Sequence, residues 1–139
     1  MDREGLVDAL ASFAIFADLP RPQLEAVVHT FHEQRFAVGQ RVLRQGISGA
    51  GFHVIVEGEA AVRIDGEERA RLGRGDFFGE LSVLLGDLPV ADIVALSALR
   101  CLVLPGPALE DWLLSRPTVT LRMLQTELRR LRSANTWRS

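Results

Sequence analysis

Glycines divide the middle of the chain into short apolar segments, and this spacing restricts the fold more than any other feature. Between Arg35 and Pro105 the segments are rich in Val, Ile and Phe, and the glycines stand at positions 39, 46, 49, 51, 58, 66, 73, 75, 79 and 86. Short β-prone segments separated by turn residues are typical of antiparallel strands. The sequence therefore predicts an all-β barrel or roll in this region.

Two of the breaks between these segments have the composition of tight turns. Asp65-Gly66 separates AAVRI from EERARL and is a dipeptide preferred in two-residue β-hairpins. Glu57-Gly58-Glu59 separates FHVIV from AAVRI, and we expect a hairpin turn there in the same way.

The segments before and after the glycine-rich region have helical spacing. Apolar residues recur at helical intervals in DREGLVDALASFAIF, and PRPQLEAVVHTF starts a second helix with Pro22 in its first turn. Pro105 ends the last strand, ALEDWLL predicts a helix, and Pro117 permits another. A chain of 139 residues with 47% hydrophobic content fits one domain. We divide it into N-terminal helices (1–33), a β-roll (34–106) and C-terminal helices (107–137).

Residue types and motifs argue against an enzyme. The basic residues are all arginines and there is no tyrosine, which excludes a P-loop lysine, a Schiff base and lysine or tyrosine acid catalysis. Nucleophile elbows, catalytic Cys/His pairs and H-E-x-x-H are missing from the sequence. His29, His32, Glu33 and His53 lack the close H-x-H pattern of metal-binding barrels, so we expect no metal and no cofactor. Cys101 lies in the apolar run LRCLVLP, where we expect a buried structural thiol.

Charge is distributed unevenly along the chain. Residues 112–139 carry six arginines and one glutamate, whereas residues 1–111 are acidic overall. A solvated helix face docked on the acidic body explains this tail, and nucleic acid or a membrane surface is the alternative. No stretch approaches the ~20 apolar residues of a membrane span, and the acidic N-terminus differs from a signal peptide. The expected location is therefore cytoplasmic, without membrane insertion.

The last predicted helix carries a leucine seam. Its members follow a three-four spacing that continues to Asn135, and they are Leu121, Leu124, Leu128 and Leu131. Two such helices can pair as a short coiled coil, in which an asparagine on the seam fixes the register. The seam either forms a homodimer in this way or packs on the chain's own β-roll.

The segment GDFFGELS, residues 75–82, has the features of an anion-binding loop. Glycine at position 79 allows a close approach of the backbone to a ligand, and the amides of Glu80, Leu81 and Ser82 open a helical turn. A carboxylate beside a phosphate repels it unless the carboxylate oxygens contact something else, such as a sugar hydroxyl. The combination therefore indicates a nucleotide pocket, in which Glu80 accepts from a ribose and backbone amides hold the phosphate.

Four stretches give the chain a resemblance to the cyclic nucleotide-binding domain family over essentially its whole length. They are FADLPRPQLEAVV, FAVGQRVLRQG, FHVIVEGEAAV and LGRGDFFGELSVLLGDLPVADIVAL. We expect the third stretch, FHVIVEGEAAV, to form a hairpin. The resemblance implies a double-stranded β-helix, that is, a jelly-roll-like β-roll of eight strands with flanking helices. It also implies that Phe78, Gly79, Glu80, Leu81 and Ser82 form the first half of the phosphate-binding cassette, with Glu80 on the ribose 2′-hydroxyl.

The second half of the cassette departs from the family pattern P-R-[ST]-A. The usual spacing ends at Ala91 and places Pro89 in the arginine position and Val90 in the Ser/Thr position, so both side-chain phosphate partners are missing. Alternation along a strand places Asp92 on the same face as Val90, close to the expected phosphate. Losing the arginine should weaken binding by roughly ten- to several-thousand-fold.

Three further residues are candidates for contacts with a nucleotide. Arg74 or Arg63 could supply the missing guanidinium, although spacing does not place either one in the pocket. In the last helix, the positions that bond the purine in some relatives carry Ala134 and Asn135, so only Asn135 could bond a base.

The resemblance implies a standalone regulatory module that senses cAMP or cGMP and signals by closure of its C-terminal helix. The alternative is a degenerate domain that binds no nucleotide, or another anion, and serves in protein interaction or dimerisation. Relatives that regulate transcription add a helix-turn-helix after this helix. Because this chain has none before Ser139, we do not expect sequence-specific DNA binding.

Overall fold

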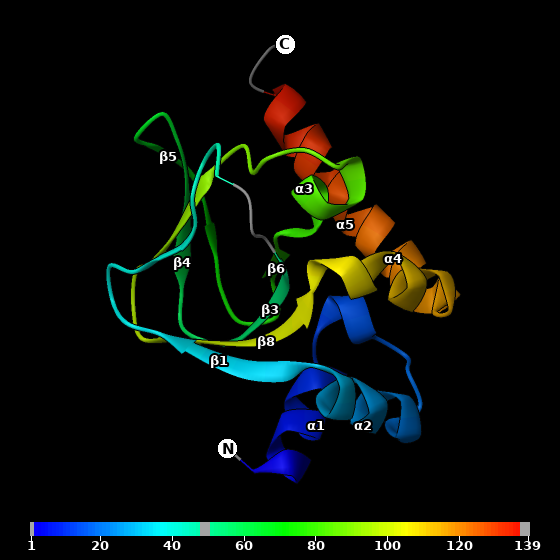
Figure 1. Cartoon of the computed structure of the whole chain (residues 1–139). Helices are drawn as coiled ribbons and strands as arrows, with labels where there is room; N and C mark the ends of the chain where they lie inside the picture. The colour runs from blue at the N-terminus through cyan, green and yellow to red at the C-terminus, as the bar shows by residue number, and fades with distance from the viewer. Residues whose placement is uncertain (1, 48–50, 137–139) are drawn as a thin grey trace.

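The computed structural model describes residues 2–47 and 51–136, and within them the chain forms an eight-stranded roll with helices on one side. The helices are α1 (Arg3–Ala11), η1 (Ala14–Phe16), α2 (Arg21–Thr30), α3 (Glu80–Leu85), α4 (Gly106–Leu114) and α5 (Pro117–Thr136). The strands are β1 (His32–Phe36), β2 (Arg41–Leu43), β3 (Gly51–Glu57), β4 (Ala60–Ile64), β5 (Glu67–Leu72), β6 (Phe77–Phe78), β7 (Asp92–Ala95) and β8 (Leu99–Pro105). Figure 1 shows the helices gathered on the side of the roll away from β4 and β5.

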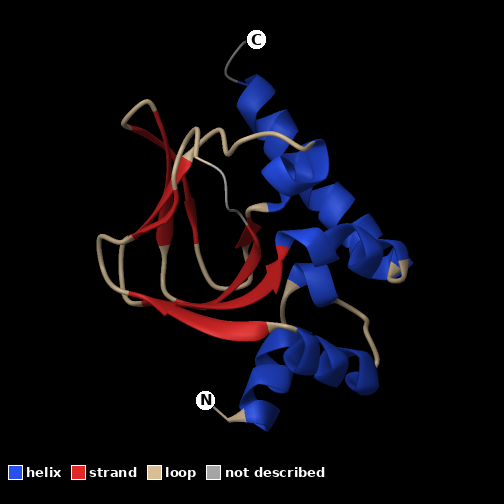
Figure 2. Ribbon diagram, viewed as in Figure 1, coloured by secondary structure: helices blue, strands red, loops and turns tan. Residues whose placement is uncertain are grey.

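The strands pair in two antiparallel sheets, which confirms the predicted mainly β roll. Sheet I has the order β1-β8-β3-β6 and sheet II the order β2-β7-β4-β5. Strands distant in the sequence are neighbours in both, as with β3 and β8, where Phe52 lies opposite Leu104. Figure 2 shows the two sheets as one β layer folded on itself, with the helices outside. The strands thus form a roll in which each sheet has one inner face.

Alternation along the strands of sheet I produces two separate cores. Along β3 the side chains of His53 and Ile55 point into the roll, whereas Phe52 and Val54 point towards the helices, and all four are buried. The roll interior contains Phe36, Leu43, Ile55, Ala60, Leu72, Phe78, Ile93, Ala95, Leu99, Cys101 and Val103. The core under the helices includes Phe52, Val54, Phe77, Leu102, Leu104, Trp112, Val119 and Met123. The central strands of sheet I, β3 and β8, are therefore buried on both faces, which explains their nearly continuous apolar sequence, whereas β1 at the edge is mostly exposed.

The two predicted turns have different outcomes. Asp65 and Gly66 both have positive φ, at 53° and 83°, and connect paired β4 and β5, so this hairpin is confirmed. The hairpin expected at Glu57-Gly58-Glu59, and so within FHVIVEGEAAV, is wrong, because β3 and β4 belong to different sheets. Gly58 instead carries the chain from one sheet to the other with φ 94°, and a Cβ there would lie 2.3 Å from the carbonyl oxygen of Ala98. A glycine can mark a corner as well as a hairpin.

The flanking helices form where the sequence predicted them. Pro22 lies in the first turn of α2, where its missing N–H costs no hydrogen bond, and Pro117 begins α5. α5 packs on η1 and α4 through buried Val119 and Met123. Within the described residues, no helix is both long and apolar enough to cross a bilayer.

Candidate functional site

The first half of the cassette is a sharp turn from β6 into α3. Gly79 caps the helix with φ 92°, and a Cβ at this position would lie 2.0 Å from the carbonyl oxygen of Gly51. Only glycine combines this backbone conformation with so close an approach. α3 then begins at Glu80, which confirms the predicted helical turn. The turn fixes where the side chain of Glu80 starts.

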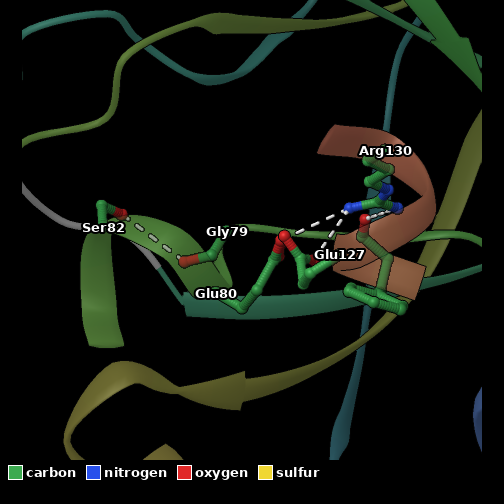
Figure 3. A network of polar contacts seen from close by, with 6 residues as sticks. Gly79, Glu80, Ser82, Glu127 and Arg130 are labelled. Carbon is green, nitrogen blue, oxygen red and sulfur yellow. Dashed lines mark hydrogen bonds and ion pairs between the residues drawn. The ribbon is translucent and has the colours of Figure 1, made fainter. Parts of the chain in front are cut away.

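The side chain of Glu80 points away from solvent towards α5 (Figure 3). The residue is 2% exposed. Its Oε1 lies 3.4 Å from Nη1 of Arg130, and its Oε2 has no hydrogen-bond partner among the described residues. A buried acceptor without a partner is rare and costs stability, so it marks a position where a donor can be bound.

Arg130 is held by four contacts at this site. Its Nη1 also lies 3.4 Å from Oε1 of Glu127, one turn earlier on α5, and its Nη2 donates to the carbonyl oxygen of Phe77 at 2.8 Å. The guanidinium carbon lies 4.5 Å from the centre of the Phe77 ring, a cation–π distance. Arg130 therefore connects the C-terminal helix to both sides of the β6–α3 turn.

Burial dominates the electrostatics of Glu80. Burial, followed by the neighbouring carboxyl of Glu127, raises the pKa of this carboxyl to about 8. The backbone amide of Glu80 and the guanidinium of Arg130 act in the opposite direction and do not compensate. Near neutral pH, Glu80 is consequently held mostly in its protonated form.

The roll wall beneath the turn is aromatic. Phe78 stacks on His53 with ring centres 4.6 Å apart, and Nδ1 of His53 lies 2.8 Å from the carbonyl oxygen of Gly51. Burial lowers the pKa of His53 to about 4, so the ring is uncharged at neutral pH. These contacts fix the backbone of β3 against the glycine turn.

The remaining residues of the predicted first half lie around α3. Leu81 is exposed and Ser82 is half-buried, with its Oγ 3.5 Å from the carbonyl oxygen of Gly79. The structure thus brings Phe78, Gly79 and Glu80 together and leaves Leu81 at the surface.

The second half of the cassette offers no side-chain donor. Pro89 is buried and its carbonyl oxygen accepts from the amide of Gly46 at 2.8 Å, whereas Val90 is 63% exposed. Ala91 is buried. The expectation that Asp92 shares a strand face with Val90 is wrong, because β7 begins at Asp92 and strand alternation does not reach Val90. Oδ1 of Asp92 accepts from the amide of Gln45 at 2.7 Å.

The guanidinium that reaches Glu80 is one that sequence reasoning missed. Arg74 is exposed with its guanidinium 5.8 Å from the Phe13 ring, and Arg63 lies opposite Asp92 on β4, so neither contacts Glu80 in the described structure. Arg130 lies seven residues after buried Met123 on α5, and this spacing places it on the same helix face. That spacing was the available signal in the sequence, although the leucine seam of the same helix is the more conspicuous pattern.

The leucine seam occupies the opposite, outward side of α5. All four leucines are more than half exposed, namely Leu121, Leu124, Leu128 and Leu131. The expectation that the seam packs on the chain's own roll is therefore wrong. Ala134 is exposed, and Asn135 lies in α5 with its side chain outside the described part of the structure.

The arginines of the tail dock partly on the body of the protein. Nη2 of Arg122 lies 2.8 Å from Oδ2 of Asp18, and Arg130 contacts Glu80. These contacts favour a helix docked on its own acidic body. Cys101 is buried in the roll interior as predicted, and burial raises the pKa of its thiol to about 12. Within residues 2–47 and 51–136, no group of three His, Cys, Asp or Glu side chains is arranged to hold a metal.

Comparison with curated proteins places the chain beside cyclic-nucleotide-dependent kinases. It is 30% identical over 133 residues to cGMP-dependent protein kinase, isozyme 1, of Drosophila melanogaster, which covers 96% of this chain and 16% of the kinase. It is 33% identical over 102 residues to the cGMP-dependent protein kinase egl-4 of Caenorhabditis briggsae, which covers 68% of this chain and 14% of the kinase. The chain thus matches only a small part of each kinase.

Comparison with solved structures supports the same relationship. The catabolite activator protein of Thermus thermophilus superposes with a TM-score of 0.78 at 26% identity, covering 88% of this chain and 60% of that one. The N-terminal domain of a transcriptional regulator from Streptomyces coelicolor superposes with a TM-score of 0.67 at 30% identity and 93% coverage of both chains. The cyclic nucleotide-binding domain family model matches residues 33–116, more than half of the sequence. The chain belongs to the cyclic nucleotide-binding domain family.

Proposed function

We propose that the chain is a regulatory module that senses a cyclic nucleotide, cAMP or cGMP, and signals through the position of α5. The proposal depends on one observation, the geometry of Glu80. Its Oε1 contacts Arg130 on α5, and its buried Oε2 lacks a partner within the described structure. A single carboxyl group thus connects a vacant acceptor to the C-terminal helix. The module acts by binding rather than by catalysis.

In this proposal the ribose and the phosphate are held by different parts of the turn. A ribose hydroxyl donates to Oε2 of Glu80, as the family resemblance implies. The phosphate lies at the start of α3, where the backbone amides of Leu81 and Ser82 have no carbonyl partner inside the helix. Filling the vacant acceptor removes the cost of burying it and stabilises the docked position of α5.

The loss of the phosphate clamp determines the expected affinity. Pro89 and Val90 offer no donor, so the phosphate contributes less than a charge-assisted pair, which provides about 1.5–3 kcal/mol. Binding should therefore be weak, in the high micromolar to millimolar range. For the same reason, a cyclic nucleotide should bind little better than the matching nucleoside.

Calorimetric titration with cAMP, cGMP, adenosine and guanosine tests this function. We expect weak binding of at least one cyclic nucleotide, which Glu80→Ala removes and Glu110→Gln, a control on the exposed face of α4, leaves unchanged. The double substitution Pro89→Arg with Val90→Ser should strengthen binding of the cyclic nucleotide tenfold or more and leave the nucleoside unaffected. Absence of binding in both the native chain and the double variant at millimolar ligand would reject the sensor function.

The alternative function is a module that binds no nucleotide, or another anion, and serves in protein interaction and dimerisation. Two observations favour it: the cassette has lost both phosphate-binding side chains, and the leucine seam of α5 is exposed. The occupant that fits the seam is a second copy of the same helix, because a three-four leucine spacing is self-complementary in a coiled coil.

Sedimentation equilibrium tests the alternative. A dimer through the seam should dissociate when Leu124→Asp and Leu128→Asp are combined, and it should persist when exposed Arg129 is replaced by Gln. A native chain that stays monomeric at several hundred micromolar, with and without cyclic nucleotide, would exclude dimerisation through α5.

A further inference from the structure

The Glu80 site contains a second acidic residue that neither the cassette motif nor the proposed function uses. Glu127 lies on α5, one helical turn before Arg130, and the two glutamates approach the same nitrogen atom. Nη1 of Arg130 is 3.4 Å from Oε1 of Glu80 and 3.4 Å from Oε1 of Glu127 (Figure 3). Two carboxyl groups therefore share one guanidinium at the contact between α3 and α5.

Charge counting shows why this arrangement depends on a proton. With both glutamates ionised, the site holds two negative charges and one positive charge, and the side chain of Glu80 is only 3% exposed. A net negative charge in a buried site is unfavourable. With one proton bound between the two carboxyl groups, the three side chains are neutral overall. The protonated state is thus the one that suits the docked helix.

The other groups around Glu80 do not supply a further charge. β6 contributes the carbonyl oxygen and the ring of Phe77, which both contact Arg130. β3 contributes His53, whose pKa is lowered to about 4 by burial, so it stays uncharged above that pH. Among the described residues, Glu127 and Arg130 are the charged side chains that act on the pKa of Glu80, which is raised to about 8.

We propose that Glu127 is a positioning residue of this site. Glu80 and Glu127 hold one proton and the Arg130 guanidinium between them, and we call this arrangement the clasp. The clasp docks α5 on the cassette and weakens when the proton is lost. The clasp makes the docked helix sensitive to pH from mildly acidic conditions up to about pH 8. This inference deepens the proposed function, since the bound proton regulates the same site. The docking of α5 itself requires no ligand.

The sign of the pH dependence follows from linkage. The pKa of Glu80 is raised in the docked state from an ordinary value of 4.5 to about 8. The stabilisation is therefore fully present below pH 4.5 and is lost as the pH rises through 8. Because one proton is involved, the docking equilibrium should fall by up to about tenfold per pH unit between those values.

The test follows the ligand-free chain between pH 6 and 10 with two measurements. Carboxyl ¹³C NMR reports the titration of Glu80. Amide hydrogen exchange reports the protection of α5, and dividing it by the protection of α4 corrects for the intrinsic pH dependence of exchange. In the native chain we expect Glu80 to titrate well above its ordinary range. The protection of α5 relative to α4 should fall at least several-fold between pH 7 and pH 9.

Glu127→Gln distinguishes the clasp from a simple anchor for Arg130. Removing the second negative charge should lower the pKa of Glu80 and reduce the loss of α5 protection at pH 9, because Glu80 and Arg130 then form a pair without net charge. Burial remains as the larger cause of the raised pKa, so part of the pH dependence should persist. A merely structural Glu127 would instead lose protection at every pH. Glu110→Gln, at an exposed position of α4, is the matched control and should behave like the native chain.

Three results would overturn the inference: titration of Glu80 in its ordinary range, pH-independent protection of α5, or loss of protection in Glu127→Gln at all pH values. None of them bears on cyclic nucleotide binding, which is measured separately by calorimetry. A working clasp in a chain that binds no nucleotide would leave this inference intact and reject the sensor function.

Discussion

Two arginines in this protein each lie between two glutamates, and the electrostatics of the two sites are opposite. Arg100 on β8 contacts Glu33 and Glu57, and Arg130 on α5 contacts Glu80 and Glu127. At the first site the arginine is buried, with its side chain 7% exposed against 34% for Glu33. At the second site the carboxylate is buried, with 3% exposure for Glu80 against 33% for Arg130.

The buried partner decides the direction of the pKa shift. Buried Arg100 stays ionised, and its hydrogen bond lowers the pKa of the more hydrated Glu33. Buried Glu80 loses its hydration, and a guanidinium that is partly in solvent does not restore it, so its pKa rises to about 8. One arginine and two glutamates therefore build a structural ion pair around Arg100 and a proton-dependent contact at the candidate site.

The largest effect is expected from Glu80→Gln at alkaline pH. The amide mimics the protonated carboxyl, so it removes the cost of an ionised buried group above the ordinary pKa of 4.5. Chemical denaturation at pH 9 should show the variant more stable by about 2 kcal/mol, whereas at pH 5 the difference should be below about 1 kcal/mol. A variant that is less stable than the native chain at pH 9 would show that Arg130 outweighs burial at this site.

A smaller effect of opposite sign is expected from Glu33→Gln. The pKa of Glu33 is lowered in the folded state, so its contribution is present above the ordinary value of 4.5 and is lost as the pH falls through the folded value. At pH 7 the variant should lose about 1–2 kcal/mol, a figure reduced because a third of Glu33 is solvated. In acid denaturation curves the loss should shrink progressively as the pH falls below 4.5. A deficit that stays constant as the pH falls would assign the effect to packing rather than to charge.

The smallest effect is expected from Glu57→Gln at the same site. The side chain of Glu57 is 53% exposed and lies 3.4 Å from Nη1 of Arg100, which is the geometry of a weak surface pair. The change in the free energy of unfolding should stay below about 0.5 kcal/mol at pH 7 and should shrink further at high salt. A cost equal to that of Glu33→Gln would mean that burial of the arginine alone sets the strength of the site.

Local sequence patterns predicted most of the fold and the start of the site. The short apolar segments between glycines predicted the strands, and the prolines predicted the helix starts. Asp65-Gly66 predicted the hairpin because its backbone conformation is encoded in those two residues. Gly79 and Glu80 marked the β6–α3 turn in the same way. The hairpin predicted at Glu57-Gly58-Glu59 was wrong because a glycine between two strands has two structural meanings. Gly58 lies at a corner between the two sheets, although glycines also occur in hairpin turns.

The contacts of the site could not be read from local patterns, because they join residues far apart in the chain. Arg130 reaches Glu80 across fifty positions, and the sequence offered Arg74 and Arg63 as more adjacent candidates. The helical spacing from Met123 to Arg130 places both on one face of α5, but spacing alone does not say which face docks.

The sequence by itself determined the roll, the Asp65-Gly66 hairpin, the glutamate of the cassette and the loss of its phosphate-binding side chains, since each depends on residue type or on a short pattern. Only the tertiary structure decided which face of α5 is covered, which arginine meets Glu80 and which partner of each ion pair is buried. Burial results from the packing of distant elements, and it sets the charge state of Glu80. For that reason the proton dependence of this site became evident only from the folded chain.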